Sequence, residues 1–281
     1  MAGMREKPWW VLVWISALLM LSPIANGADL DTVIAGRSDT DQARDQYRHP
    51  IETLSLFEVE PGMTVVETLP GRGWYTRILV PYIGASGRYF GANYEIGIFK
   101  RMFGDRWESR RSGVESWPQT FPAEAASYSS TPPETGAFTI GQAPAELIGT
   151  VDRMLFIRSL HHLNRFDRSI LDKAAAEAFA LLKPDGIVGV VQHRAPESND
   201  EEWANGSQGY LKQTRVIEAF EGAGFDLAAT SEINANPKDV PTESDRVWRL
   251  PPSLRAEGEA RETNLDIGES DRMTLKFLKR N

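Results

Sequence analysis

Apolar and polar positions alternate along most of the chain with two periods, and this pattern predicts an α/β fold. From Met63 onward, short apolar runs of strand length are followed by stretches whose apolar residues have helical spacing. Such alternation is typical of a mostly parallel, doubly wound sheet with helices on both faces. The expected strands cover 64–67, 88–92, 138–140, 153–157, 187–192, 226–233 and 272–278, and the expected helices cover 74–83, 96–103, 167–182 and 211–221.

A polar, helix-permissive stretch precedes the first expected strand. Ser38 and Asp41 are candidate N-caps in it, and Pro50 divides it into two short helices. We therefore expect a helical lead-in over 28–58 and one α/β domain over 59–281.

Two other stretches predict irregular structure. Residues 110–135 are rich in Ser, Pro, Glu and Thr, which favours irregular surface structure. The Lys-Pro-Asp-Gly sequence at 183–186 favours a turn, because proline cannot continue the preceding helix and glycine tolerates a positive φ.

The first 27 residues have the layout of a cleavable export signal. Arg5 and Lys7 precede an apolar segment over 9–21, and Ala25 and Gly27 are small residues at the positions that precede a cut. The apolar segment is shorter than the roughly 20 residues that span a bilayer. We expect cleavage after Gly27, a periplasmic or secreted product, and no stable membrane anchor afterwards. An uncleaved anchor and a buried helix are the alternatives.

The composition excludes several classes of function. The 31 Lys and Arg residues against 39 Asp and Glu residues give a net charge of -8, so no overall positive field would hold a nucleic acid. Cysteine is absent from the sequence, which excludes disulfides, thiolate metal ligands and cysteine nucleophiles. Nucleic acid is therefore not expected as the main partner.

The first expected strand ends in a turn with the features of a nucleotide-type cofactor site. Glu67 ends the apolar run, and Gly71 and Gly73 follow before the next expected helix. Glycines let the backbone approach a ligand closely, and the helix start offers unpaired N–H groups. An ordinary tight turn is the alternative, because a single G-x-G pair is not specific.

Ligands of a doubly wound sheet bind at the carboxyl ends of its strands, so the residues after other strands are candidates as well. Asn93 follows the second expected strand, where a ribose-binding acid usually lies. Gln142 follows the third, where its amide could meet an adenine edge.

All four histidines lie in segments predicted near this edge. His161 and His193 are the candidate catalytic residues, because imidazole is well suited to removing a proton near neutral pH. Adjacent His161 and His162 are expected to point in different directions, so that only one enters the site. Each could instead have a structural or surface role. A metal site that also recruits His49 and Glu52 is a further alternative, but no histidine pair has the helical i, i+4 spacing of zinc motifs, and we expect no metal.

Arginines stand beside these histidines. A guanidinium binds carboxylate or phosphate through a planar fork, so Arg158 and Arg194, with His49, are the candidate substrate-binding residues. Arg48 is in the same position beside His49. Internal salt bridges to Glu52 or Glu67 are the alternative. The long connection that contains Trp248 is expected to cover the site as an ordered flap or to plug the sheet edge.

The chain resembles the class I S-adenosylmethionine-dependent methyltransferases, and more closely an uncharacterised group of often exported methyltransferases. The resemblance covers about 41–279. The motifs that carry it are 44–54, 61–67 with 70–76, 158–161, 182–186, 193–195, 231–237 and 270–275.

The resemblance implies a Rossmann-like methyltransferase fold with S-adenosylmethionine as cofactor and a small molecule as the methyl acceptor. It places Glu67, Gly71 and Gly73 at the methionine part, Asn93 at the ribose and Gln142 at the adenine. The chain departs from the family pattern at its turn, where Leu69 replaces the first glycine, and at Asn93 and Gln142, which stand where acids are usual. Export also separates the protein from the cytosol, where the donor is made. An exported binding or scaffold protein that keeps the fold without the cofactor is therefore the rival hypothesis.

Overall fold

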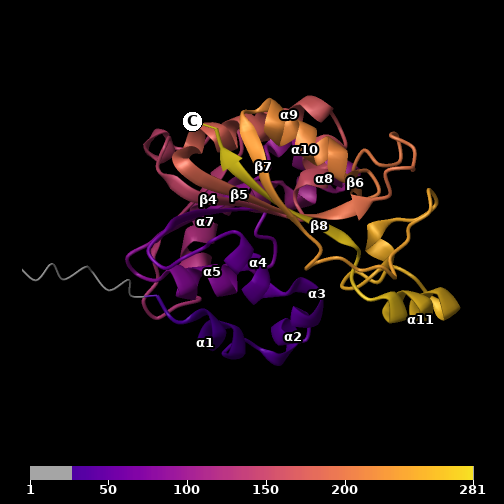
Figure 1. The fold of residues 1–281 in the computed structure, drawn as a ribbon, viewed down its shortest axis with the longest axis horizontal. Coiled ribbons are helices and arrows are strands. Elements are labelled where there is room, and N and C mark those ends of the chain that lie inside the picture. The colour runs from indigo at the N-terminus through magenta and orange to yellow at the C-terminus, as the bar shows by residue number, and fades with distance from the viewer. Residues whose placement is uncertain (1–26, 281) are drawn as a thin grey trace, which may run out of the picture.

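This computed structural model describes residues 27–280. A central sheet lies between two layers of helices (Figure 1). Seven strands follow one path in the order β3-β2-β1-β4-β5-β8-β7, and β6 pairs beside β5. The strands are β1 (Thr64–Thr68), β2 (Arg88–Asn93), β3 (Glu134–Thr139), β4 (Val151–Ile157), β5 (Leu182–Ala195), β6 (Leu211–Lys212), β7 (Phe225–Ser231) and β8 (Arg272–Lys279).

The strand order confirms the expected doubly wound, mostly parallel sheet. Strands β1 to β5 pair in parallel, and β8 runs antiparallel between β5 and β7. The order 3-2-1-4-5 is that of nucleotide-binding sheets, in which the strand order reverses between β1 and its neighbour β4. The chain therefore leaves these two strands in opposite directions and opens a crevice at their carboxyl ends.

Helices cover both faces of the sheet (Figure 1). Neighbouring residues of β1 separate the two cores, because side chains alternate along a strand: Val65 packs with the lead-in and Val66 packs with the opposite layer. One layer holds α1 (Leu30–Ala35), α2 (Asp39–Gln42), α3 (Asp45–Arg48), α4 (Pro50–Leu56) and α5 (Thr76–Ile83). The other holds α6 (Ile96–Phe103), α8 (Leu160–Asn164), α9 (Arg168–Leu181) and α10 (Gln213–Gly222).

The remaining helices lie at the margins of the sheet. Helix α7 (Trp107–Ala126) contacts the edge strand β3, and α11 (Gly258–Ile267) lies beyond the start of β8 (Figure 1). Short 3-10 helices in the connections are η1 (Gly104–Arg106), η2 (Ala145–Leu147) and η3 (Val247–Arg249). Among residues 27–280, no helix has both the length and the apolar character needed to cross a membrane.

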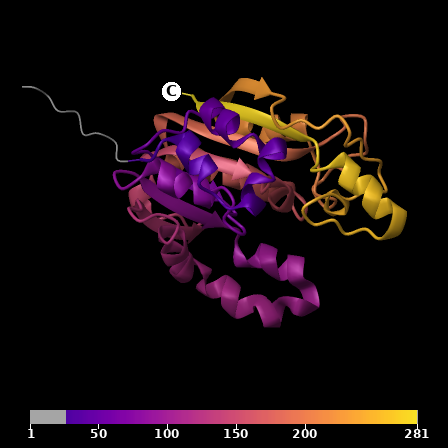
Figure 2. The same ribbon diagram turned by 90° about the horizontal axis from the view of Figure 1, so that it is seen from below.

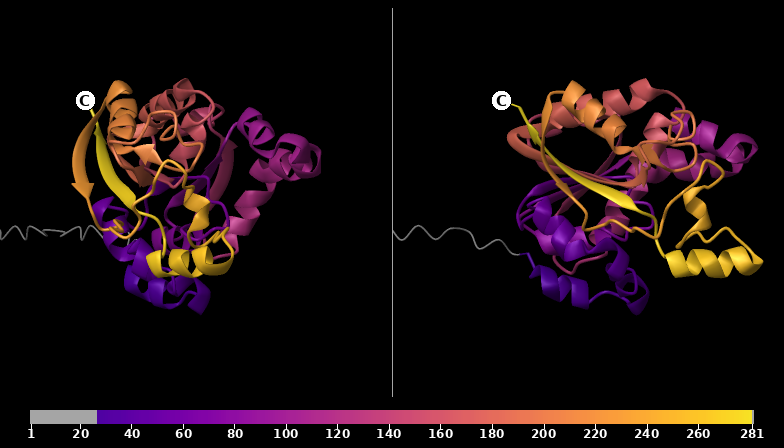
Figure 3. Two further views of the ribbon diagram at one scale, coloured as in Figure 1. Left: turned by 90° about the vertical axis from the view of Figure 1, so that its right-hand side faces the viewer. Right: turned by 45° about the vertical axis from the view of Figure 1, so that its right-hand side comes forward.

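The expectation of irregular structure over 110–135 was wrong, because α7 occupies most of that range and extends with α6 from the β3 edge (Figure 2 and Figure 3). Trp117 and Phe121, four residues apart, stack with ring centroids 4.5 Å apart, and Phe121 is buried against β2. This packing outweighs the poor helix propensity of the segment, including that of Pro118 and Pro122. Tertiary contacts, absent from any local pattern, stabilise this helix.

The expected turn at 183–186 is also corrected. It lies inside β5, where the pairing with β4 moves from Leu182 opposite Val151 to Ile187 opposite Arg153. The additional residues form an irregularity in the strand rather than a separate turn. The expected export signal falls on residues 1–26, outside the described residues, and export stays a prediction.

Gly91 in β2 allows α7 to pack closely on the sheet. A Cβ at this position would lie 2.4 Å from Phe121 Cε1. Because overpacking a core costs about 1–3 kcal/mol, we expect Gly91→Ala to lower the free energy of unfolding by about 2 kcal/mol in urea titrations. Gly113→Ala, in α7 with open space around the new methyl group, is the control and should be neutral or stabilising. Equal losses in the two variants would contradict this account.

Candidate functional site

A cleft of about 310 Å³ opens at the carboxyl ends of β1, β4 and β5, where the strand order reverses. Its walls come from the turn after β1, the end of β4, the start of α8, the end of β5 and a distant connection near η3. The volume lies at the lower end of the range for small-molecule sites, roughly 300–1,000 Å³.

The turn after β1 presents open backbone to this cleft. Gly71 borders the cleft with φ of +63°, and a Cβ there would meet only the Leu69 carbonyl oxygen at 3.7 Å. Leu69 itself has φ of +48°, and its N–H donates to the Ala92 carbonyl at 2.7 Å. Leu69 thus keeps the left-handed conformation that suits glycine, at a cost of about 1–2 kcal/mol. Its side chain, which borders the cleft, is the part that differs from the family pattern.

Glu67 supports the turn from below and does not border the cleft. Its carboxylate accepts hydrogen bonds from Tyr89 Oη at 2.6 Å and Thr76 Oγ1 at 2.8 Å. Burial raises the pKa of Glu67 to about 7, although both hydrogen bonds act against the shift. The acid therefore ties β1 to β2 and α5, which places it in a positioning role rather than at the ligand.

Three histidines border the cleft together. The rings of His161 and His162 have centroids 4.0 Å apart, and His193 lies 5.6 Å from His161. The expectation that only one of the adjacent pair enters the site was wrong. The ring centroid of Trp248 lies 6.1 Å from those of both His161 and His162, and its ring stacks on His162.

Burial keeps these imidazoles uncharged near neutral pH. It lowers the pKa of His161 to about 4 and the pKa of His193 well below its usual value, and neighbouring arginine charges lower the pKa of His193 further. His193 Nδ1 lies 2.5 Å from Ser270 Oγ, and His161 Nδ1 lies 3.4 Å from Gln192 Oε1. Each ring is therefore held by a polar neighbour while it borders the cleft.

The connection that contains Trp248 borders the cleft. Val247, Trp248 and 250–253 border it beside the histidines, while Arg249 forms ion pairs with Asp239 and Asp245 at 2.8 Å each. This connection therefore forms one wall of the cleft.

Other residues expected at the cofactor lie outside the lining of the cleft. Asn93 is half-buried, and its Oδ1 accepts a hydrogen bond from the Tyr94 N–H at 2.9 Å. Gln142 is exposed beyond β3. Gly73 is buried, and a Cβ there would lie 3.1 Å from Tyr128 Oη.

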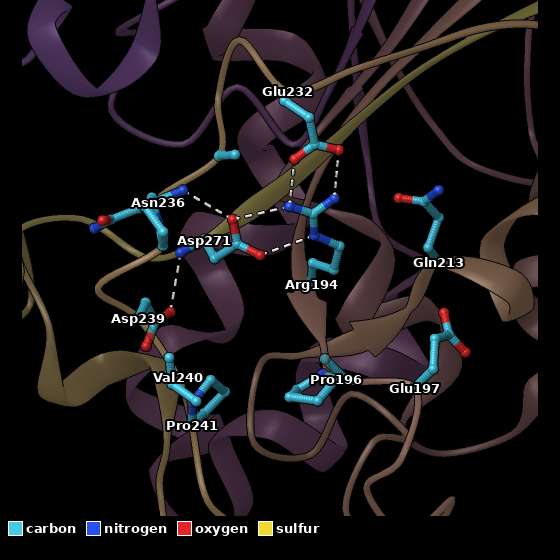
Figure 4. A pocket seen from close by; sticks show the side chains of 13 residues that line it. Arg194, Pro196, Glu197, Gln213, Glu232, Asn236, Asp239, Val240, Pro241 and Asp271 are labelled. Carbon is cyan, nitrogen blue, oxygen red and sulfur yellow. Dashed lines mark hydrogen bonds and ion pairs between the residues drawn. The ribbon is translucent and has the colours of Figure 1, made fainter.

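Arg194 and His49, expected to bind substrate, lie at other cavities. Figure 4 shows Arg194 between Glu232 and Asp271. The two ion pairs measure 2.6 and 2.8 Å. Its guanidinium is therefore occupied by an internal ion pair, although the partners are Glu232 and Asp271 and not the expected Glu52 or Glu67. His49 borders a separate cavity near Asn234. Of the predicted site residues, the cleft lining thus brings together Gly71, Arg158, His161 and His193.

Four arginines gather around one carboxylate beside the cleft. Glu269 lies 2.5 Å from Arg44 and Arg272 and 3.2 Å from Arg48. Arg158, at the end of β4, forms no ion pair with any residue in 27–280. Its positive charge nevertheless lowers the pKa of Glu269. Burial alone would raise the pKa of Glu269, but the four arginines outweigh it and lower that pKa to about 2.

The sequence alone indicated no role for Arg44, Arg272 or Glu269. The spacing of Arg44 and Arg48 by four residues was a signal, since it places both on one helical face. No local signal pointed to Glu269, which lies 221 residues beyond Arg48.

A second basic cavity of about 480 Å³ adjoins the cleft, and His162 and Trp248 border both. None of its arginines forms an ion pair within the described part of the chain. They are Arg106, Arg165, Arg246 and Arg255. The approach to the cleft is therefore positively charged although the chain as a whole is acidic.

Within the described residues, the histidines of the cleft do not form part of a group of side chains that could bind a metal ion. Across residues 27–280, no three His, Asp or Glu side chains are placed to hold one metal ion.

The chain matches no known family model and no curated protein sequence. Solved structures do resemble it. A chain of the complex between the Haloferax volcanii Trm112 methyltransferase activator and a methyltransferase is 17% identical, covers 90% of this chain and 98% of its own length, and has a TM-score of 0.52. The [4+2]-cyclase SpnF is 15% identical over 87% of this chain and 84% of its own, with a TM-score of 0.50.

These similarities show that the chain has the Rossmann-like methyltransferase fold. A S-adenosylmethionine-dependent methyltransferase from Aquifex aeolicus is also similar, at 13% identity over 89% of this chain and 98% of its own, with a TM-score of 0.48. The cyclase shows that related folds carry different chemistry, so the reaction has to be argued from the cleft.

Proposed function

We propose that the protein is a S-adenosylmethionine-dependent methyltransferase that acts on a small-molecule acceptor. The observation that carries the proposal is the open Gly71 turn, which faces a cleft at the strand-order reversal of a methyltransferase fold. Ligands of doubly wound sheets bind at this place, and backbone without a Cβ allows close approach.

The residues at the methionine end of the cleft fit the proposed cofactor. Gly71 leaves room for the cofactor to approach the backbone of the turn. Asn93 lies outside the lining of the cleft, and because its Oδ1 accepts from the Tyr94 N–H, only its Nδ2 is left to donate to a ribose hydroxyl. Gln142 stands apart from the cleft, so the adenine contact would come from other residues.

Methyl transfer requires few side chains of the protein to take part in the chemistry. When bound, S-adenosylmethionine would supply a methyl group, and its sulfur would keep the electron pair of the broken S–C bond. Alignment of the acceptor then provides most of the catalysis. His161 and His193 border the cleft as neutral imidazoles, so either could accept the proton from an acceptor that must lose one. Trp248 forms part of the cleft wall and would limit the entry of water.

Calorimetric titration of the purified protein with S-adenosylmethionine and S-adenosylhomocysteine tests the proposal. We expect micromolar dissociation constants for both ligands. Gln142→Ala should bind as the wild type does, because Gln142 is exposed and outside the cleft. A folded wild-type protein that binds neither ligand at millimolar concentration would favour the exported binding or scaffold protein instead.

Removal of the flap indole should speed ligand release. Trp248 contacts the rings of His161 and His162 across the cleft, so Trp248→Ala opens one wall. We expect the dissociation rate of S-adenosylhomocysteine to rise about tenfold in stopped-flow measurements, which corresponds to about 1.4 kcal/mol. Trp248→Phe keeps an aromatic ring and should stay within about threefold of the wild type. Unchanged release from the alanine variant would mean that the flap does not hold the ligand.

A further inference from the structure

We infer that Arg44, Arg48, Arg158 and Arg272 form a built anion subsite beside the cleft, which binds the carboxylate or phosphate group of a ligand. The inference stands on the geometry of these residues. Only the naming of the methyl acceptor as the source of the anion rests on the proposed function.

The charges of the cluster do not balance. Glu269 is the one carboxylate within ion-pair distance of any of the four guanidinium groups in residues 27–280. Three positive charges therefore remain in excess in a largely buried place. Arg48 and Arg272 are only 1% and 2% exposed. Burial of unpaired charge is costly, so proteins rarely retain such a cluster without a binding role.

Hydrogen-bond donors of the cluster also remain without partners. Arg48 Nη1 and Nη2 and Arg158 Nε are buried, and none of them has a hydrogen-bond partner within residues 27–280. A guanidinium presents parallel N–H groups in the geometry that a carboxylate or phosphate accepts. The cluster thus offers both the charge and the donors that an anion requires.

The cluster opens onto the cleft on one side and is supported on the other. Arg44 and Arg158 border the cleft, together with Trp74. Arg48 lies behind them, with its guanidinium carbon 4.6 Å from the centroid of Trp74. Arg272 donates to the Tyr47 carbonyl at 3.2 Å. An anion that enters the cleft beside Gly71 would therefore meet Arg44 and Arg158 first.

The charge of the methyl donor points to the acceptor as the source of the anion. The donor carries a sulfonium and an ammonium against one carboxylate, so its net charge is positive and the excess arginine charge opposes it. An acceptor with a carboxylate or phosphate would restore the balance. The adjoining basic cavity, with its four arginines, would also raise the local concentration of anions at the entrance.

Titration with inorganic phosphate tests the subsite without any cofactor. We expect phosphate to raise the melting temperature of the wild type at low ionic strength. Arg158→Gln should weaken phosphate binding at least tenfold, and it should raise the melting temperature measured without phosphate, because it removes an unpaired buried charge. A merely structural arginine would give the opposite stability change. Arg111→Gln, on exposed α7, changes the net charge equally and should leave phosphate binding unchanged.

Equal responses to phosphate in the wild type and in Arg158→Gln would overturn the subsite, as would the absence of any response in the wild type. Arg158→Lys provides a second check that keeps the charge: loss of the planar fork should weaken phosphate binding by an intermediate factor. Phosphate binding that depends on Arg158 in a protein that binds no S-adenosylhomocysteine would leave the subsite standing and remove the proposed methyltransferase function.

Competition identifies the source of the anion. If the acceptor supplies it, phosphate and S-adenosylhomocysteine bind together, and saturating phosphate leaves the affinity for the latter unchanged. If the carboxylate of the donor supplies it, phosphate competes with S-adenosylhomocysteine but not with 5′-methylthioadenosine, which lacks that carboxylate. The second result would keep the subsite and overturn its assignment to the acceptor.

Discussion

Gly71→Ala is expected to weaken the binding of S-adenosylhomocysteine about 100-fold while the protein stays folded. Gly71 has φ of +63° and borders the cleft, and only the Leu69 carbonyl lies within 4 Å of an added Cβ. A methyl group there would project where the ligand approaches the backbone. The expected loss corresponds to about 2.7 kcal/mol of binding free energy, measurable by calorimetry.

Gly149→Ala is the matched control for this variant. Gly149 has φ of +67°, is exposed, and has open space around an added Cβ, but it lies outside the lining of the cleft. Both substitutions should lower the free energy of unfolding by a similar amount, about 1 kcal/mol, because both force an L-residue into the left-handed region. Only Gly71→Ala should lose affinity. Equal affinities in the two variants would show that the ligand does not approach this turn.

Glu67→Gln is expected to remove a pH dependence of stability worth about 3 kcal/mol. Burial raises the pKa of Glu67 from 4.5 to about 7, so the folded protein holds a proton that the unfolded chain releases. The contribution of this group is fully present below about pH 4.5 and is lost as the pH rises through 7. Each pKa unit corresponds to about 1.4 kcal/mol.

Urea titrations between pH 4.5 and 8 measure this effect. The glutamine variant retains a carbonyl oxygen to accept the hydrogen bonds of Tyr89 and Thr76, so it should match the wild type near pH 4.5 and exceed its stability at pH 8. Glu95→Gln, at an exposed position after β2, should change the free energy of unfolding by less than about 0.5 kcal/mol at either pH. A constant difference between Glu67→Gln and the wild type across the range would contradict the raised pKa.

The elements that could be predicted from the sequence were those whose pattern is local. Strand β1 is a continuous apolar run because its five residues are buried on both faces of a parallel sheet, and α6 was predicted with its observed bounds. Helix α7 could not be predicted, since its stability comes from the contact of Phe121 with β2. Propensity and periodicity hold no information about a partner 30 residues away in the chain.

The candidate site divides in the same way. Gly71, Arg158 and His161 come after strands, and His193 lies near the end of β5; because these strands end at one edge, strand order alone brings the four residues to one cleft. His161 and His162 both border the cleft, and both lie beside Trp248, which comes more than 80 residues later in the sequence. The different directions of adjacent side chains therefore did not predict that both histidines border the same cleft.

The sequence by itself determined the class of fold, the place of the ligand-binding edge and the residues of the Gly71 turn, because each depends on short-range periodicity and turn chemistry. Only the tertiary structure decided which polar groups are occupied and which are free. It paired Arg194 with Glu232 and Asp271, placed Glu67 beneath the turn, and left Arg158 without a carboxylate in the described part of the chain. Charge pairing depends on distances between residues that are remote in sequence, and folding alone establishes those distances.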